Sequence, residues 1–220
     1  MKLRKQFSPT GCFPSLSYIV TVPDDMDAAN EKLPLIVFLH GAAARGEDLD
    51  LLDEVVGMPL LFGETSTFNG VRAITLSPQC PSGAVWNHLV FPVKELIDHI
   101  LEEYPIDRDR VSITGFSMGG FGTWDVICTY PKLFSAAAPI CGGGLSWRAG
   151  ALKTLPIRVF HGDADTVVPL SYSEQMVDAV KKIGGNISLT VYPGVDHSSW
   201  IPAYRTSDVI EWLVLQKRGE

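Results

Sequence analysis

The stretch RVSITGFSMGG, residues 110–120, places one serine among glycines, directly after residues that alternate like a β-strand. Residues 118–130, MGGFGTWDVICTY, then favour a helix. Gly115, Ser117 and Gly119 form the pattern G-x-S-x-G, in which the serine takes a strained backbone at a sharp strand-to-helix turn and projects its Oγ clear of the sheet. Chance places such a match in about one of every ten chains of this size. Its position between a predicted strand and a predicted helix favours a nucleophile over an ordinary loop serine.

Strands and helices alternate along the rest of the chain. Apolar, β-branched runs that stop at Gly or Pro predict strands at 33–41, 71–79, 110–117 and 155–163, with weaker candidates at 134–143 and 186–194. Residues 16–23, LSYIVTVP, predict an edge hairpin strand. Apolar residues at helical spacing predict helices at 91–105, 118–130, 171–185 and 206–217. This alternation predicts an α/β fold with a mostly parallel central sheet, helices on both faces, and active groups at the carboxyl ends of the strands.

The domain organisation is predicted to be simple. The length of 220 residues fits one domain, 1–220, because there is no internal repeat or linker. Residues 141–154, CGGGLSWRAGALKT, form only a short loop, so no large cap domain is expected and the pocket should be open.

Net charge, apolar runs and cysteine spacing limit the classes of binding partner that we expect. A net charge of −7 disfavours binding to nucleic acid or to an anionic membrane surface, and no run is long and apolar enough to span a bilayer. The four cysteines lack C-x-x-C or zinc spacing, so we expect free thiols and no metal. Pro9, Gly11 and Pro14 interrupt the segment after the basic start, so no signal peptide is visible. A cytoplasmic protein and a trimmed secreted protein both remain possible.

A nucleophilic serine needs a histidine base, and His197 is the best candidate. It is the only histidine after the strand predicted at 155–163, and it follows another strand-like run, as the chain order Ser, Asp, His requires. His40 and His161 lie in His-Gly turns, where hydrogen bonding to the loop is the ordinary role. His88 has no strand to place it, and His99 lies off the apolar stripe of its helix.

The acid that orients the base should follow the preceding strand, where HGDADTVVP offers two aspartates. Asp165 lies deeper in the loop and is better placed to reach across the site. Asp163 directly follows a glycine and is more typical of a residue that closes its own turn. Asp196 is adjacent to His197 in the sequence, a position that more often points away.

The oxyanion of a tetrahedral intermediate needs backbone N–H donors, which we expect from Ala42 and Met118. Arg45 either orients the loop of Ala42, binds substrate or is simply solvated. Four aromatic residues fall on loops predicted at the active face or beside the nucleophile, and we predict that they line the substrate pocket: Phe116, Trp86, Trp147 and Trp200. Tryptophans pack cores equally well, so core packing is the competing interpretation.

With these residues placed, the chain resembles the α/β-hydrolase superfamily over nearly its whole length. It is most similar to the small bacterial esterase and predicted-peptidase group, with its phospholipase/carboxylesterase and polyhydroxybutyrate-depolymerase-like relatives. The motifs that resemble the group follow one another along the chain in the same order as in its members, and they include PLIVFLHGAAARGEDL, DRVSITGFSMGGFGTWD, RVFHGDADTVVP and YPGVDHSSW. The resemblance implies a triad of Ser117, Asp165 and His197. The group usually reads HGAGERG where residues 40–46 read HGAAARG, a departure in the oxyanion loop.

The residues and the resemblance together lead us to expect a serine esterase. Ser117 would attack an ester carbonyl, His197 would move the proton, and water would release the acyl group, with no cofactor and no metal. Without a cap, short-chain or aromatic esters, free or carbohydrate-linked, fit better than long-chain lipids. The alternatives are a serine peptidase of the same fold and a non-catalytic binding module.

Overall fold

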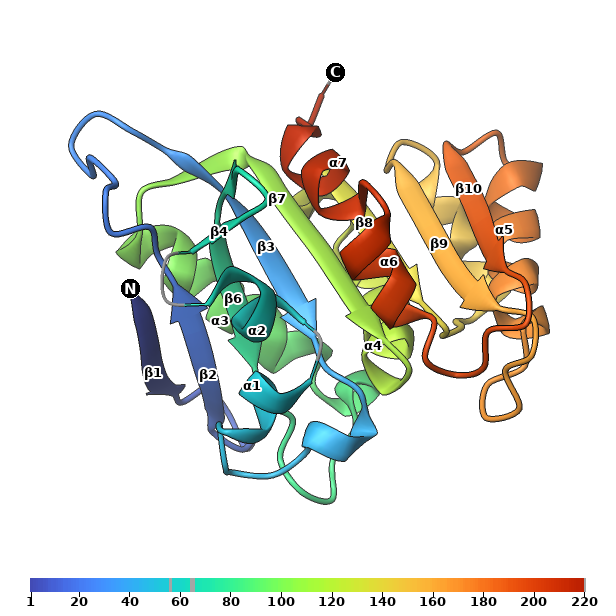
Figure 1. Cartoon of the computed structure of the whole chain (residues 1–220), viewed down its shortest axis with the longest axis horizontal. Helices are drawn as coiled ribbons and strands as arrows, with labels where there is room; N and C mark the ends of the chain where they lie inside the picture. The colour runs from blue at the N-terminus through green and yellow to red at the C-terminus, as the bar shows by residue number, and fades with distance from the viewer. Residues whose placement is uncertain (56, 64–65, 220) are drawn as a thin grey trace.

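A computed structural model describes residues 1–55, 57–63 and 66–219. Within these ranges, eight strands form one sheet in the order β1-β2-β6-β3-β7-β8-β9-β10 (Figure 1). Their bounds are β1 Lys2–Phe7, β2 Leu16–Thr21, β3 Leu33–Leu39, β6 Ile74–Pro78, β7 Ile106–Phe116, β8 Ala136–Ile140, β9 Ile157–Gly162 and β10 Ile187–Tyr192. The strands from β6 to β10 in this order are parallel, whereas β1 pairs antiparallel with β2, and β2 with β6. The predicted α/β fold with a mostly parallel sheet is confirmed.

Helices cover both faces of the sheet (Figure 1). One face packs against α3 (Val90–Glu103), α4 (Met118–Thr129) and α5 (Ser171–Lys182). The other packs against α2 (Met58–Phe62), α6 (Trp200–Thr206) and α7 (Val209–Leu215). The remaining elements are short: α1 Leu51–Glu54, the hairpin β4 Thr67–Phe68 with β5 Val71–Arg72, and the 3₁₀ turns η1 Ala42–Ala44, η2 Trp86–His88, η3 Pro131–Leu133 and η4 Ser146–Leu152. In the described ranges none of these segments forms a cap domain, as expected.

The central strand β3 shows why the sequence reads as a continuous apolar run. All seven of its residues are buried. Leu35 and Val37 belong to the core on the α3–α5 side, whereas Ile36 and Phe38 belong to the core on the α6–α7 side. Because neighbouring residues of a strand point to opposite faces, a strand covered on both faces needs an apolar residue at every position.

The hairpin strand predicted at 16–23 is present as β2, but its predicted position at the edge of the sheet is wrong. β2 lies inside the sheet, and the edge is β1, formed by the basic residues that resembled the start of a signal sequence. Leu3 and Phe7 pack against the core from one face of β1, whereas Lys2 pairs with Asp53 at 2.7 Å on the other. The apolar residues at positions 3 and 7, opposite to polar residues at 2, 4 and 6, were the weak sequence signal of this strand.

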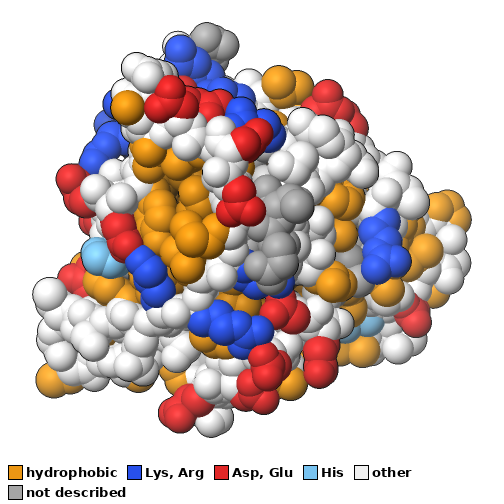
Figure 2. Space-filling view, turned by 60° about the vertical axis from the view of Figure 1, so that its left-hand side comes forward, with side chains coloured by type: hydrophobic (Ala, Val, Ile, Leu, Met, Phe, Trp, Pro, Cys, Tyr) orange, Lys and Arg blue, Asp and Glu red, His pale blue; other side chains and the backbone are white. Residues whose placement is uncertain are grey.

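The view of Figure 2, turned toward the left-hand side of Figure 1, shows an area of hydrophobic side chains bordered by charged side chains of both signs. Ion pairs at the β1 edge include Arg4 with Asp50 at 2.6 Å and with Asp53 at 2.8 Å. Charged side chains of this kind discourage further strands from pairing with a sheet edge. No helix in the described part of the chain is long and apolar enough to cross a membrane.

The C-terminal helix differs from its predicted range of 206–217. It is shorter, α7 at Val209–Leu215, and α6 precedes it. The side chain of Ser207 between the two helices caps the second, because its Oγ accepts a hydrogen bond from Val209 N at 3.2 Å. The turn brings α6 close to the end of β9 and the loop that carries His197 (Figure 1).

Candidate active site

Ser117 lies at the turn between β7 and α4, where the G-x-S-x-G pattern predicts it. Its backbone has φ 56° and ψ −122°, a conformation that residues other than glycine rarely adopt. The amide of Ser117 donates to Ile140 O at 3.0 Å, and its own carbonyl accepts from Phe121 N at 3.0 Å. These bonds on both sides hold the strained residue in place.

The glycines beside Ser117 are required by the close approach of three chain segments. A Cβ on Gly119 would lie 1.8 Å from Leu39 O, and a Cβ on Gly115 would lie 2.6 Å from the same oxygen. Only glycine therefore lets the start of α4 pack against the end of β3. The motif thus fixes the turn sterically, besides presenting the serine.

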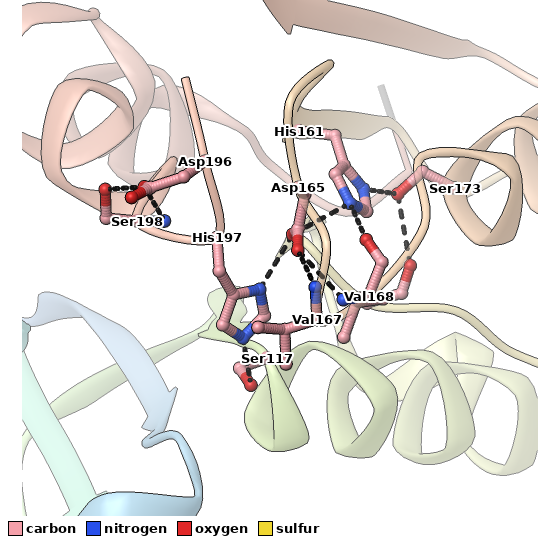
Figure 3. Close-up of polar contacts among 10 residues, drawn as sticks. Ser117, His161, Asp165, Val167, Val168, Ser173, Asp196, His197 and Ser198 are labelled. Carbon is pink, nitrogen blue, oxygen red and sulfur yellow. Dashed lines mark hydrogen bonds and ion pairs between the residues drawn. The ribbon is translucent and has the colours of Figure 1, made fainter. Parts of the chain in front are cut away.

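His197 and Asp165 meet Ser117 at the carboxyl edge of the sheet (Figure 3). His197 Nε2 lies 2.8 Å from Ser117 Oγ, and His197 Nδ1 lies 2.7 Å from Asp165 Oδ2. Because a carboxylate can only accept, Nδ1 carries the proton and Nε2 is left to accept from the serine hydroxyl. The loops after β7, β9 and β10 thus join residues 117, 165 and 197 in one hydrogen-bonded chain.

Asp165 is only 8% exposed, yet its surroundings favour the carboxylate. Its Oδ1 accepts from Val167 N at 2.9 Å and from Val168 N at 2.8 Å. Burial by itself raises the pKa of Asp165, but the hydrogen bonds from His197, Val168 and Val167 outweigh it, and the net effect is a lowered pKa. Asp165 is therefore ionised at neutral pH.

The two competing aspartates bond elsewhere. Asp163 accepts from Gly194 N at 2.6 Å, in the loop after β10, and therefore does not close its own turn as predicted. Asp196 accepts from the amide and the hydroxyl of Ser198 and points away from the site (Figure 3). Among the candidate acids, only Asp165 contacts His197 in the described structure.

His40 shapes the loop after β3. Its Nδ1 lies 2.6 Å from Gly41 O, its Nε2 accepts from Cys80 N at 2.9 Å, and its carbonyl accepts from the indole of Trp86 at 2.9 Å. Burial lowers the pKa of His40 to about 4. The neutral imidazole therefore fastens this loop to the chain that follows β6.

The expected oxyanion donors, Ala42 and Met118, belong to two elements that begin at the cleft of Ser117. Ala42 begins η1 and lines the same cleft as Ser117, and Met118 is the first residue of α4. The first N–H groups of a helix have no intrahelical partner and favour negative charge. Arg45 donates to Ala42 O at 3.2 Å and to Ala84 O at 3.4 Å, contacts that orient the loop.

A cleft of about 470 Å³ opens at Ser117. Trp200 stacks on Phe116 in its wall, with ring centroids 4.3 Å apart, and meets His197 edge-on at 5.6 Å. The remaining lining is small or apolar except for one carboxylate, and it comprises Gly41, Ala42, Ala43, Ala44, Glu54, Val55, Val167 and Ile201. A larger cavity, of about 590 Å³, lies at the amino ends of β8 and β9, beside Ser135 and Pro156. Residues 117, 165 and 197 do not line it.

Two of the four predicted pocket aromatics are elsewhere. Trp86 is fully buried and packs edge-on against His40, so the prediction that it lines the pocket is wrong. Trp147 is 78% exposed on η4 and is not among the residues that line the cleft. Sequence reasoning in turn missed Val167 and Ile201, whose only signal is that each follows a predicted site residue by a few positions.

The described residues also include one group with metal-binding atoms, formed by Cys141, Asp165 and His197, whose ligand atoms lie within 4.8 Å of one another. Two of the three are already hydrogen-bonded to each other at 2.7 Å. Burial raises the pKa of Cys141 to about 12, so its thiol is protonated at neutral pH. Asp165 and His197 therefore use these atoms in a hydrogen bond to each other, and the thiol of Cys141 keeps its proton.

The sheet order, the strained serine turn and the residues aligned with it define the class of α/β hydrolases. Residues 83–209 match the model of the phospholipase/carboxylesterase family, which is more than half of the chain. The chain belongs to the phospholipase/carboxylesterase family, a family of hydrolases.

Individual proteins agree with this assignment. A thermostable esterase of known structure is 35% identical, with a TM-score of 0.86 over 99% of this chain and 63% of that one. Acyl-protein thioesterase 1 of Neurospora crassa is 35% identical over 102 residues, 43% of this chain and 42% of that protein. A protein named as a feruloyl esterase C from Aspergillus niger is 28% identical over 173 residues, 77% of this chain and 61% of that protein. The chain thus spans less than two thirds of each of these relatives.

Proposed function

We propose that residues 1–220 form one catalytic unit, a serine esterase that cleaves carboxylic esters through an acyl-enzyme on Ser117. The observation that carries this proposal is the continuous hydrogen-bonded chain from Ser117 Oγ through His197 to the buried carboxylate of Asp165. Membership of a phospholipase/carboxylesterase family supports the same reaction.

In the proposed mechanism, Ser117 Oγ attacks the ester carbonyl carbon while His197 Nε2 takes the hydroxyl proton. Asp165 holds the Nδ1–H tautomer and stabilises the imidazolium that forms. The backbone N–H groups of Ala42 and Met118 receive the negative charge that develops on the carbonyl oxygen. When the intermediate collapses, His197 gives the proton to the leaving alcohol, and the acyl group stays on Ser117.

Deacylation repeats these steps with water in place of the serine. His197 takes a proton from water, the resulting hydroxide attacks the acyl carbon, and the carboxylic acid leaves as the proton returns to Ser117. Each proton is exchanged with a substrate, a water molecule or a residue of this chain.

The lining of the cleft supports short-chain or aromatic acyl esters, including carbohydrate-linked ones, as the proposed substrate class. It is mostly apolar, and the stacked rings of Phe116 and Trp200 offer a flat surface to an aromatic acyl group. The Aspergillus niger relative is named for feruloyl ester cleavage. The cleft has no apolar lid in the described part of the chain, and long acyl chains would leave much of their surface in water.

Hydrolysis of an ester panel tests this proposal. The panel contains acetyl, butyryl and octanoyl esters, a feruloylated sugar, an acetylated sugar and a matched peptide amide. We expect the highest kcat/KM with the short-chain or feruloyl esters and no turnover by Ser117→Ala. A preference for the octanoyl ester contradicts the substrate class, preferential cleavage of the amide indicates a peptidase, and absence of any turnover indicates a binding module.

A further inference from the structure

His161 lies at the end of β9, is fully buried, and contacts the carboxylate of Asp165. Its Nε2 lies 3.3 Å from Asp165 Oδ2 and 2.8 Å from Val168 O, and its Nδ1 lies 2.7 Å from Ser173 Oγ on α5 (Figure 3). The sequence predicts for this histidine only the ordinary bond of a His-Gly turn. Its contact with Asp165 gives it a connection to the catalytic chain.

The hydrogen-bond partners of His161 place a proton on its Nε2. Val168 O can only accept, so Nε2 donates to it at 2.8 Å. On the other side of the ring, Nδ1 lies 2.7 Å from Ser173 Oγ, which donates to Gly142 O at 3.1 Å. The imidazole therefore joins the 165–168 loop to α5 and, through Ser173, to the loop after β8.

This arrangement gives Asp165 two imidazole neighbours. Its Oδ2 faces His197 Nδ1 at 2.7 Å on one side and His161 Nε2 at 3.3 Å on the other. His161 also holds the carbonyl of Val168, the residue whose amide donates to Asp165 Oδ1. The titratable groups around this point are Asp165 itself, His197 and the protonated thiol of Cys141.

We propose that His161 is a positioning residue of the esterase, which holds Asp165 and the 165–168 loop against α5. This inference rests on the proposed function. Without His161, Val168 O loses its donor and Asp165 loses the imidazole that lies 3.3 Å from its Oδ2, so the loop that presents the carboxylate is held less firmly. The carboxylate then orients His197 less well for proton transfer, so kcat falls. His161 is buried and does not line the cleft, so substrate binding is unaffected.

The test compares His161→Leu with the conservative His161→Gln and with Val159→Ala, a control that loosens the core face of the same strand. For His161→Leu we expect kcat to fall about tenfold or more and KM to stay within about twofold. His161→Gln retains a side-chain N–H donor and recovers most of kcat. Val159→Ala loses stability but keeps kcat within about twofold of wild type, and an equal fall of kcat in Val159→Ala would overturn the positioning role.

A measurement without substrate separates this inference from the proposed function. In protein labelled with ¹⁵N-histidine, the NMR signal of His197 Nδ1–H reports its hydrogen bond to Asp165 and is assigned by its loss in His197→Gln. We expect this signal to move or broaden in His161→Leu and, by a smaller amount, in Ser173→Ala, which removes the partner of His161 Nδ1. The same change in a protein that cleaves no ester refutes the esterase and keeps the positioning role. A signal unchanged in both variants overturns that role.

Discussion

The indole of Trp200 lies almost parallel to the ring of Phe116, at an interplanar angle of 16° and a centroid distance of 4.3 Å. Phe116 is the last residue of β7 and precedes the nucleophile, whereas Trp200 opens α6 three residues after His197. The stack therefore joins the turn of Ser117 to the loop of His197 and forms one wall of the cleft. A change in this wall should affect both the fit of an acyl group and the position of His197.

Trp200→Ala is expected to lower kcat/KM for a feruloyl ester by roughly 10- to 100-fold, because a hydrophobic pocket contact is worth about 1–3 kcal/mol. The loss for an acetyl ester should be smaller, since a methyl group covers little of the wall. Steady-state kinetics on both esters measure the difference. Trp147→Ala is the matched control, because Trp147 is exposed outside the cleft lining. Equal losses for both esters would contradict an acyl-binding wall.

Asp165→Asn is expected to lower kcat by roughly 10³- to 10⁴-fold, because an amide can donate to Nδ1 and favours the wrong tautomer of His197. Asp163→Asn should stay within a few-fold of wild type, since Asp163 bonds only to a turn amide among the described contacts. Rates with a short-chain ester at neutral pH compare the two variants. If Asp163→Asn caused the larger loss, our assignment of the acid would be wrong.

The stability of the protein should depend on pH through His40. The pKa of His40 is lowered from 6.5 to about 4 in the folded state. Between these two values His40 binds a proton in the unfolded chain but not in the folded protein. The contribution of His40 to the free energy of unfolding therefore falls by roughly 3 kcal/mol between pH 6.5 and 4, and this contribution changes little below that range. Urea unfolding across this range should show a shallower fall in His40→Gln, with the exposed His99→Gln as the control. Parallel curves for wild type and His40→Gln would refute this origin of the pH dependence.

Thiol reactivity gives an independent check of the packing. Cys12 is exposed, and the other three cysteines are buried. Burial raises the pKa of Cys80 and Cys128 to about 11 and that of Cys141 to about 12. A disulfide reagent at neutral pH should therefore modify one thiol of the native protein quickly, and none in Cys12→Ser. All four should react in denaturant, and rapid reaction of Cys141 in the native state would contradict its burial beneath the site.

The sequence alone predicted those parts of the fold that neighbouring residues in the sequence determine. The turn at Ser117 could be predicted because only glycine at positions 115 and 119 permits the approach to Leu39 O. The proposed roles of His197 and Asp165 followed from chain order and strand position, and the structure aligns both with Ser117. β1 was missed because paired basic residues on an edge strand resemble an unstructured or targeting segment.

The cleft lining could not be predicted, because it depends on how loops meet in space. Trp86 and Trp200 both follow strand ends, but the indole N–H of Trp86 finds the carbonyl of His40 and the ring is buried. Trp200 instead lies at the start of a helix whose preceding loop carries His197, so its ring reaches the cleft. Both tryptophans were predicted on loops at the active face, and only the tertiary contacts distinguish the buried ring from the one that lines the cleft.

The most direct test of the central claim is covalent labelling with a fluorophosphonate, followed by mass spectrometry of the intact protein and its peptides. We predict one adduct per chain, on Ser117, with none in Ser117→Ala and labelling slowed by at least about 100-fold in His197→Gln. Absence of an adduct on Ser117 in folded wild-type protein, or equal labelling of Ser117→Ala, would contradict the claim that Ser117, His197 and Asp165 form a working nucleophile.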